Sequence, residues 1–187
     1  MSVPRIDFPD LAGLQREHAA LIEQIKGERG SLLKLYHLLL TSPEFARGWL
    51  GLGTAARNKS SLDEKLRELV ILQIGRHFGA AYVWSTHVAI ARRAGATDEQ
   101  LAALPAPPSS PHFTERERTA LEYAQVMTDQ VRVPDELFER VRALFSPQEL
   151  LELTVTAGFY NCVCRVVIAL RLHEEPGFEP APFEPAG

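Results

Sequence analysis

Two strongly apolar helical segments, joined by a short break, fill the middle of this 187-residue sequence from Leu66 to Gly95. The first contains a carboxylate, Glu68, and the second contains an imidazole, His87. On one straight helix their 19-residue separation would amount to roughly 28 Å, at about 1.5 Å per residue. A chain reversal near Gly79 would instead place them at similar depth on two antiparallel helices. The sequence therefore predicts a helical hairpin in which Glu68 and His87 meet.

A glutamate and a histidine that meet inside an apolar pocket are candidates for general acid–base catalysis. Glu68 is followed one turn later by Ile71 and Leu72, so burial is expected to raise the pKa of its carboxyl group. Two structural roles stay open. Glu68 can be a surface carboxylate paired with Lys65 or an arginine, and His87 can be a hydrogen-bonded core residue. Pairing explains the burial of both side chains, but it does not distinguish a structural pair from a catalytic one.

The whole sequence predicts an all-α fold, because helix start signals are frequent and no segment shows the sustained alternation of a β-strand. Capping boxes, in which two side chains satisfy free backbone donors reciprocally, are expected at Ser61, Thr97, Thr114 and Ser146. The predicted helices span residues 10–27, 31–41, 43–57, 62–78, 80–94, 98–104, 115–130, 134–145 and 147–173.

Proline and glycine mark several boundaries of these helices. Pro43 and Pro134 fit first helical turns, where no hydrogen-bond donor is lost, and Gly95 fits a C-terminal cap. The Pro- and Ser-rich segment 104–113 is interpreted as a loop within one domain.

Two regions of unequal size are expected, a helical domain over residues 1–173 and a tail over residues 174–187. The tail is Pro-rich and acidic, so it is expected to lack regular structure. Its two phenylalanines, Phe178 and Phe183, are candidates for docking on a neighbour.

Composition excludes several classes of function. The net charge of −4 offers no basic surface for nucleic acid or an anionic membrane. The N-terminus shows no signal-peptide pattern, and two cysteines without an export signal indicate a reducing, cytoplasmic location. The least polar stretch contains Asn161 and Arg165, so it is interpreted as a buried helix and not as a membrane span.

The cysteines and histidines give no sign of redox or metal chemistry. Cys162 and Cys164 are two positions apart and point to different sides of a helix, which favours buried, inert thiols. The six histidines and two cysteines show no recognisable ligand spacing. No metal and no cofactor is therefore expected.

Residues 67–104, RELVILQIGRHFGAAYVWSTHVAIARRAGATDEQLAAL, closely resemble the core motif of the carboxymuconolactone decarboxylase and alkylhydroperoxidase D superfamily. That motif couples an Arg-Glu-Leu helix to a Tyr-x-Trp-x-x-His helix. The upstream LLLTSPEFARGWLGLG and the downstream SPQELLELTVTAGFYNCVCRVVIAL are similar to two further family helices. The resemblance implies an alkylhydroperoxidase D-like helical bundle, assembled into dimers, trimers or hexamers.

The same resemblance implies that Glu68 and His87 are the Glu and His of the family's proton relay. The Cys-x-x-Cys pair of alkylhydroperoxidase D-like members falls on Ala80 and Val83 here, so both thiols are missing. Val83 also replaces the glutamate that a common cysteine-free subgroup carries. Since disulfide exchange needs a thiolate, these departures argue against peroxidase chemistry.

The resulting hypothesis is a cofactor-independent acid–base enzyme of the decarboxylase or lyase type, acting on a small organic acid through Glu68 and His87. One alternative is an alkylhydroperoxidase- or peroxiredoxin-type oxidoreductase that recruits a thiol from elsewhere. Another is a non-catalytic helical oligomer or binding module. The residues expected to bind substrate are Tyr82, Trp84 and Tyr160 as pocket walls, and Arg67 and Arg76 as cations if they turn inward.

Overall fold

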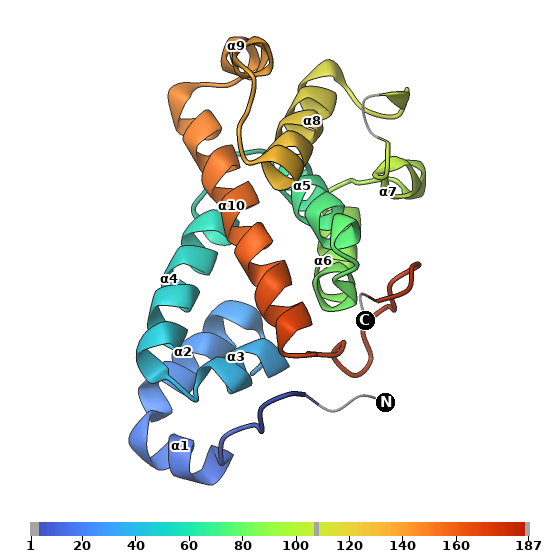
Figure 1. Ribbon diagram of the computed structural model, residues 1–187. Coiled ribbons are helices and arrows are strands. Elements are labelled where there is room, and N and C mark those ends of the chain that lie inside the picture. The colour runs from blue at the N-terminus through green and yellow to red at the C-terminus, as the bar shows by residue number, and fades with distance from the viewer. Residues whose placement is uncertain (1–3, 107–108, 186–187) are drawn as a thin grey trace.

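The structure, a computed structural model, describes residues 4–106 and 109–185, and within these ranges it contains helices and no strand (Figure 1). The predicted all-α class is confirmed. In chain order the helices are α1 (Leu11–Glu17), α2 (Ala19–Arg29), α3 (Lys34–Leu39), α4 (Pro43–Asn58), α5 (Glu64–His77), α6 (Ala81–Arg93), α7 (Asp98–Ala103), α8 (Glu115–Gln130), α9 (Asp135–Leu144) and α10 (Pro147–Ala169).

Helices α5 and α6 form the predicted antiparallel hairpin. The reversal lies at Gly79, whose φ of 65° is in the left-handed region that glycine adopts without strain. The two helices approach closely at Gly75, where an added Cβ would lie 3.1 Å from Cγ1 of Val83. A glycine at this position therefore lets the α6 backbone approach α5.

Helix α5 is the centre of the fold, since all ten residues from 66 to 75 are buried. It packs against α6, α8 and α10. Helix α10 is long and apolar enough to cross a membrane by length and composition alone. In this fold, however, Leu153, Ala157 and Cys164 of α10 are completely buried within the chain, as in the core helix of a globular domain.

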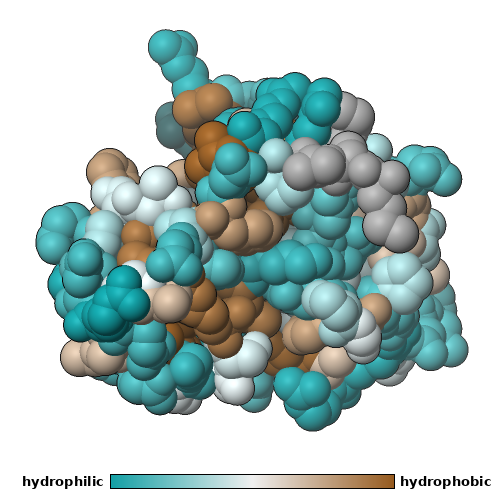
Figure 2. Space-filling view, turned by 90° about the horizontal axis from the view of Figure 1, so that it is seen from below, coloured by the Kyte–Doolittle hydropathy of each residue, from teal (hydrophilic) through white to brown (hydrophobic). Residues whose placement is uncertain are grey.

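The N-terminal helices build a second, smaller core beside the first. Leu21, Ile22 and Ile25 of α2 pack there against residues of α3 and α4. Helix α4 also contacts α10, so this layer lies against the main bundle. Seen from below, the molecule shows a band of apolar side chains between hydrophilic ones (Figure 2).

Some predicted helix boundaries are confirmed. The capping boxes at Thr97, Thr114 and Ser146 are formed, and Pro43 lies in the first turn of α4. Gly95 follows Ala94, the C-cap of α6, with a φ of 99°, as expected for a C-terminal glycine.

Other predicted boundaries are wrong. Asp63, not Ser61, caps α5, because the Ser61 hydroxyl and N–H are both bonded to the Glu152 carboxylate of α10. The predicted helix 10–27 is divided at His18, and Pro134 precedes α9 as its cap instead of lying in its first turn. Helix α10 ends at Ala169, before the predicted residue 173.

Candidate functional site

Glu68 lies completely buried in α5 between two partners. Its Oε2 lies 2.7 Å from Nδ1 of His87, and its Oε1 lies 3.4 Å from Nε of Arg67. The predicted meeting of Glu68 and His87 is therefore confirmed. A buried carboxylate with no partner would be costly, and here each oxygen has one.

His87 extends this network toward α10. The hydroxyl of Tyr160 lies 3.2 Å from Nε2 of His87, and the two rings meet edge to face at 5.1 Å. Tyr160, His87 and Glu68 thus form one hydrogen-bonded chain across α10, α6 and α5. Each ring nitrogen has a partner, which fixes the orientation of the imidazole.

Burial lowers the pKa of His87 below its ordinary value of 6.5, although the nearby Glu68 charge acts in the opposite direction. Burial also opposes ionisation of Glu68, but the His87 ring and the Arg67 charge outweigh it and hold the pKa of the carboxyl group below 4.5. The predicted rise in the pKa of Glu68 is therefore wrong, because the His87 ring and the Arg67 guanidinium lower this pKa by more than burial raises it.

At neutral pH the pair is accordingly a carboxylate beside a neutral imidazole. The imidazole proton lies on Nδ1 and is donated to Glu68, and Nε2 accepts a hydrogen bond from the Tyr160 hydroxyl. Burial raises the pKa of Tyr160, so that hydroxyl stays protonated. An acceptor nitrogen held in this way can take up a proton, and the carboxylate stabilises the imidazolium that results.

His87 forms part of the wall of a cavity of about 320 Å³. On α6 the lining residues repeat one turn apart, since Tyr82, Thr86 and Ile90 are four positions apart from one another. Helix α4 contributes Trp49, Gly53 and Arg57 with the same spacing. Helix α6 also contributes Val83, Ala89 and Arg93, and the remaining walls come from α2, α3 with its preceding residue, α10 and the C-terminal tail, through Arg29, Leu33, Leu35, Tyr36, Phe159, Tyr160, Val163 and Phe178.

Three arginines bring positive charge to this cavity, Arg29, Arg57 and the exposed Arg93. The Arg29 guanidinium is buried and bonded to the hydroxyls of Tyr36 and Thr54. Arg57 lines the cavity with no hydrogen bond or ion pair to the described part of the chain. Its charge contributes to lowering the pKa of Glu68. A guanidinium without a partner at a cavity wall can bind the carboxylate of a ligand.

The predicted substrate-binding residues lie in different places. Tyr82 and Tyr160 line the His87 cavity as expected. Trp84 does not, because it lies two positions after Tyr82 and points to another side of α6, where it meets Phe183. Arg67 pairs with Glu68 and Glu64, outside the cavity lining.

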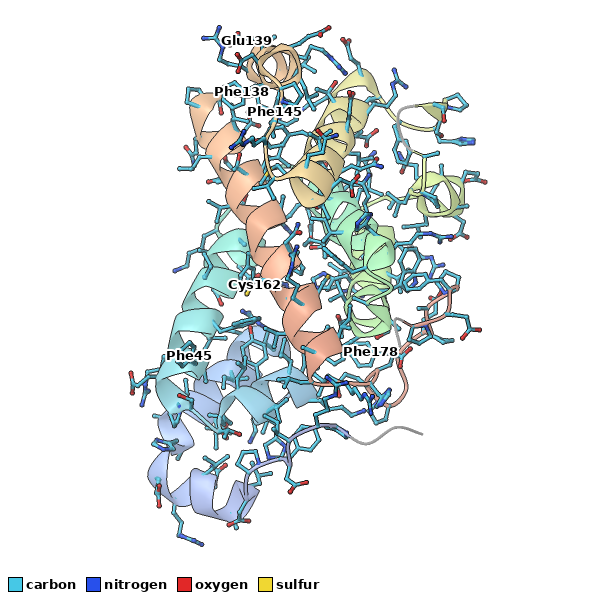
Figure 3. All side chains as sticks on the ribbon, in the orientation of Figure 1. Phe45, Phe138, Glu139, Phe145, Cys162 and Phe178 are labelled. Carbon is cyan, nitrogen blue, oxygen red and sulfur yellow. The ribbon has the colours of Figure 1, made fainter. Side chains whose placement is uncertain are left out.

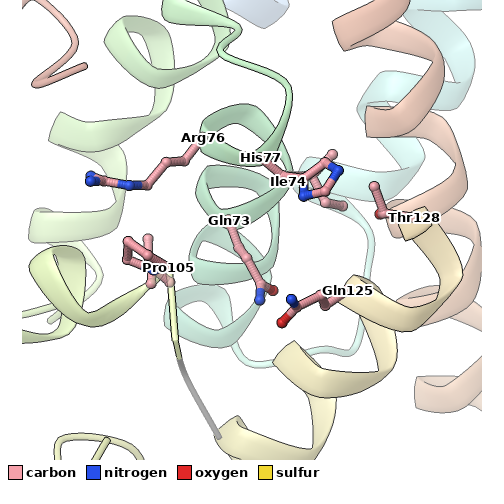
Figure 4. A pocket seen from close by; sticks show the side chains of 8 residues that line it. Gln73, Ile74, Arg76, His77, Pro105, Gln125 and Thr128 are labelled. Carbon is pink, nitrogen blue, oxygen red and sulfur yellow. The ribbon is translucent and has the colours of Figure 1, made fainter. Parts of the chain in front are cut away.

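Arg76 belongs to a second cavity of about 220 Å³ that contains neither Glu68 nor His87 (Figure 4). There the carboxamides of Gln73 and Gln125 point toward one another, and His77 lies nearby on α5. The Arg76 guanidinium also lies over the Trp84 ring. The predicted contribution of Arg76 to the Glu68–His87 pocket is therefore wrong.

Only one of the two cysteines agrees with the prediction of buried thiols. Cys164 is buried, and burial raises the pKa of its thiol to about 12. Cys162 is exposed, so the prediction of two buried thiols is wrong for this residue. Neither residue lines the His87 cavity.

Among the described residues, no group of three or more His, Cys, Asp and Glu side chains could hold a metal ion.

Sequence reasoning missed Arg57 and the aromatic residues Trp49 and Phe159. The spacing of residues 49, 53 and 57 places them on one face of α4, but nothing local to α4 shows that this face turns toward His87. Gly53 on this face lies close to α2, since an added Cβ there would lie 3.1 Å from the Arg29 guanidinium, but only the structure shows this.

Residues 43–126 match the Carboxymuconolactone decarboxylase family. The chain is 29% identical to YdfG of Bacillus subtilis over 114 residues, and this alignment covers 60% of this chain and 78% of YdfG. It is 36% identical over 120 residues to YnjA of Escherichia coli, which covers 63% of each protein. Both relatives are described as uncharacterized.

Solved structures share the fold. An AhpD-like protein of unknown function from Agrobacterium tumefaciens is 26% identical, with a TM-score of 0.68 over 73% of this chain and 94% of that protein. An uncharacterized peroxidase-related protein from Ralstonia eutropha with an alkylhydroperoxidase AhpD core gives a TM-score of 0.80 at 17% identity, over 94% of both chains. The debrominase Bmp8 gives a TM-score of 0.78 at 17% identity, and the match covers 94% of this chain and 95% of the Bmp8 chain. The family match over residues 43–126 and the helical architecture shared with AhpD-like solved structures agree, and together they support the carboxymuconolactone decarboxylase and alkylhydroperoxidase D-like superfamily for this chain.

Proposed function

We propose that this protein is a cofactor-independent acid–base enzyme of the decarboxylase or lyase type that acts on a small organic acid. The observation that carries the proposal is the position of His87. It is held between Glu68 and Tyr160 at the wall of a cavity that also contains the unpaired Arg57 guanidinium. The site thus joins a proton acceptor to a binding group for an anion.

Arg57 binds the substrate carboxylate in this proposal, and the aromatic walls surround the rest of the molecule. Glu68 stabilises the charged form of His87, so the imidazole can accept a proton and return it within one reaction cycle. In a decarboxylation, the bond from carbon to the carboxylate breaks and carbon dioxide leaves. The electron pair then stays on carbon until His87 delivers a proton that it has taken from solvent.

The rival peroxidase function receives less support. Peroxide reduction by this family's thiol route requires a thiolate at the site, and the cavity has no cysteine in its lining. Cys162 lies instead on the exposed side of α10 (Figure 3). The non-catalytic alternative, a binding module, predicts the same cavity without turnover.

Replacing Arg57 with methionine tests the binding step. Benzoate serves as the probe, and we expect the Arg57→Met substitution to weaken its binding by about tenfold or more, since hydrogen bonds to charged groups contribute about 1.5–3 kcal/mol. Calorimetric titration measures this change. Arg93→Met, which removes a more exposed arginine at the cavity rim, is the matched control and should have a smaller effect. Equal affinity for benzoate in the wild type and Arg57→Met would contradict the proposed site.

Carbon dioxide release from a panel of small lactone and keto carboxylic acids tests catalysis directly. Turnover by the wild type that is lost in Glu68→Gln supports the enzyme over the binding module. Turnover of an organic hydroperoxide with a dithiol, abolished by Cys162→Ser, would favour the peroxidase instead.

We further propose that the protein assembles into a homo-oligomer through a groove between α4 and α10. Phe45, labelled in Figure 3, is 72% exposed and Val155 is 40% exposed, and both line an open apolar groove. An added Cβ at Gly48 or Gly158 would meet nothing, so helices of a second copy can approach closely. The groove also shares Trp49 with the His87 cavity, so a second copy there would lie beside the site.

Light scattering after size-exclusion chromatography measures this assembly. We expect a mass that is a multiple of 20.8 kDa at micromolar concentration, and a monomer after Phe45→Glu. Phe138→Glu, which changes an exposed phenylalanine on α9, is the matched control and should leave the mass unchanged. A wild-type monomer at these concentrations would rule out the groove as a stable interface.

A further inference from the structure

We propose that the C-terminal tail is a specificity element of the His87 cavity, in which Phe178 provides the aromatic surface that selects ligands with a planar ring. This inference rests on the proposed function, because it assigns a substrate class to the same site. The tail lies outside the segment that matches the family, residues 43–126. It is therefore a feature that the family match does not describe.

The sequence of the tail explains how Phe178 reaches the cavity. Residues 175–178, Glu-Pro-Gly-Phe, form a tight turn closed by a hydrogen bond from the Phe178 N–H to the Glu175 carbonyl, at 3.3 Å. Proline fits the second position of such a turn, and glycine fits the third, where φ is 81° at Gly177. The turn ends by placing the Phe178 side chain at the cavity wall.

Glu175 anchors this turn to the body of the protein. Its carboxylate accepts a hydrogen bond from the Tyr82 hydroxyl at 2.9 Å and from the Lys34 N–H at 2.6 Å. Lys34 is the first residue of α3, whose preceding residue offers no side-chain cap, so the tail carboxylate satisfies a free backbone donor. The anchor thus joins the tail to α3 and to the same tyrosine that lines the cavity.

Two further contacts hold the tail along α6. Arg92 forms an ion pair with Glu179, and the Phe183 ring meets Trp84 edge to face, with ring centres 5.5 Å apart. The tail is thus attached on both sides of Phe178. Phe183, one of the two tail phenylalanines considered for docking on a neighbour, lies against α6 of the same chain.

The Phe178 ring has no aromatic partner in the described part of the chain, in contrast to Trp49, Phe159 and Tyr160, and it has no hydroxyl group to be held by a hydrogen bond, in contrast to Tyr36 and Tyr82. Trp49 contacts Phe159, and Tyr160 contacts both Phe159 and His87. Phe178 remains 43% exposed at the cavity wall (Figure 3). Its face is thus available to a ligand ring, and such a pair contributes about 0.5–1.5 kcal/mol beyond simple burial.

The inference therefore names a ligand class, a planar ring that carries a carboxylate. Arg57 binds the carboxylate and Phe178 stacks on the ring. Cyclohexanecarboxylate matches benzoate in charge and in number of heavy atoms, but its ring is puckered and has no π-system. The ratio of the two affinities therefore isolates the contribution of the planar ring.

Calorimetric titration of both probes into the full-length protein measures that ratio. We expect the wild type to prefer benzoate and Phe178→Leu to reduce this preference by about two- to tenfold, the fold-change that corresponds to about 0.5–1.5 kcal/mol. Phe183→Leu, which removes the tail ring that lies against Trp84, should preserve the preference. Gly177→Val should also reduce the preference for benzoate, because a β-branched residue is strained at a φ of 81° and would distort the turn that places Phe178. No atom lies within 4 Å of the added Cβ, so the effect would come from the backbone and not from a steric clash.

The outcomes separate this inference from the proposed function. An unchanged preference in Phe178→Leu, with benzoate binding still lost in Arg57→Met, overturns the role of the tail alone. An equal loss in Phe183→Leu also overturns it, because the effect would then come from the tail as a whole. Absence of benzoate binding by the wild type overturns both.

Discussion

Replacing Glu68 with glutamine is expected to lower the pKa of His87, because the substitution removes the negative charge that favours the imidazolium form. Burial already lowers this pKa, and the carboxylate 2.7 Å from Nδ1 is the largest influence in the opposite direction. If proton transfer limits the reaction, activity should fall on the order of 10²-fold or more. The fold should survive, since the amide oxygen can still accept the Nδ1 proton.

The measurement is the NMR titration of the His87 ring in the wild type and in Glu68→Gln. Glu64→Gln is the matched control. It removes a carboxylate from the same helix and from the same arginine, Arg67, but from a side chain that is 61% exposed and has no contact with His87. We expect that control to leave the titration of His87 nearly unchanged. The same titration in the wild type and in Glu68→Gln would mean that the two groups are not coupled, contrary to the acid–base proposal.

The hairpin was predictable because its determinants are local. Two apolar segments, a glycine at the reversal and one polar group in each segment suffice to bring Glu68 and His87 together. The capping boxes at Thr97, Thr114 and Ser146 formed for the same reason, since each depends on residues only three positions apart. The capping box predicted at Ser61 does not form, because the Ser61 hydroxyl donates its hydrogen bond to Glu152, which lies 91 residues away in the sequence.

The cavity was less predictable because its walls come from helices far apart in the sequence. Arg57 lies on α4, and its place beside His87 depends on how α4 packs across α10. The direction in which the pKa of Glu68 shifts also depends on residues brought together by the fold, because the effects of His87 and Arg67 oppose the effect of burial. Trp84 is different, because helical periodicity alone would have placed it on another face of α6 from Tyr82.

The protein is expected to lose stability steadily as the pH falls below about 6.5. In the unfolded chain His87 takes up a proton near its ordinary pKa of 6.5, whereas in the folded protein the lowered pKa keeps the ring neutral at that pH. The unfolded state therefore binds more protons, and the free energy of unfolding decreases as the pH decreases, by up to about 1.4 kcal/mol per pH unit. This loss ends when the pH reaches the lowered pKa of the folded state.

Glu68 extends the same trend to lower pH. Its pKa in the folded protein lies below 4.5, so the unfolded chain again binds the proton first, and stability is lost as the pH falls from about 4.5 through the folded value. Both groups of the pair thus destabilise the fold in acid, one after the other. A shift of either pKa in the opposite direction would instead have stabilised the protein in part of this range.

Urea unfolding at a series of pH values between 7.5 and 4 checks this expectation. His87→Gln removes the titrating ring while its amide can still donate to Glu68, so the slope between pH 6.5 and 5 should become shallower than in the wild type. His112→Gln, which replaces an exposed histidine, is the matched control and should retain the wild-type slope. A wild-type slope in His87→Gln would show that the proton uptake belongs to other groups. The buried Glu68–His87 pair would then contribute nothing to acid sensitivity, and the lowered pKa of His87 would be wrong.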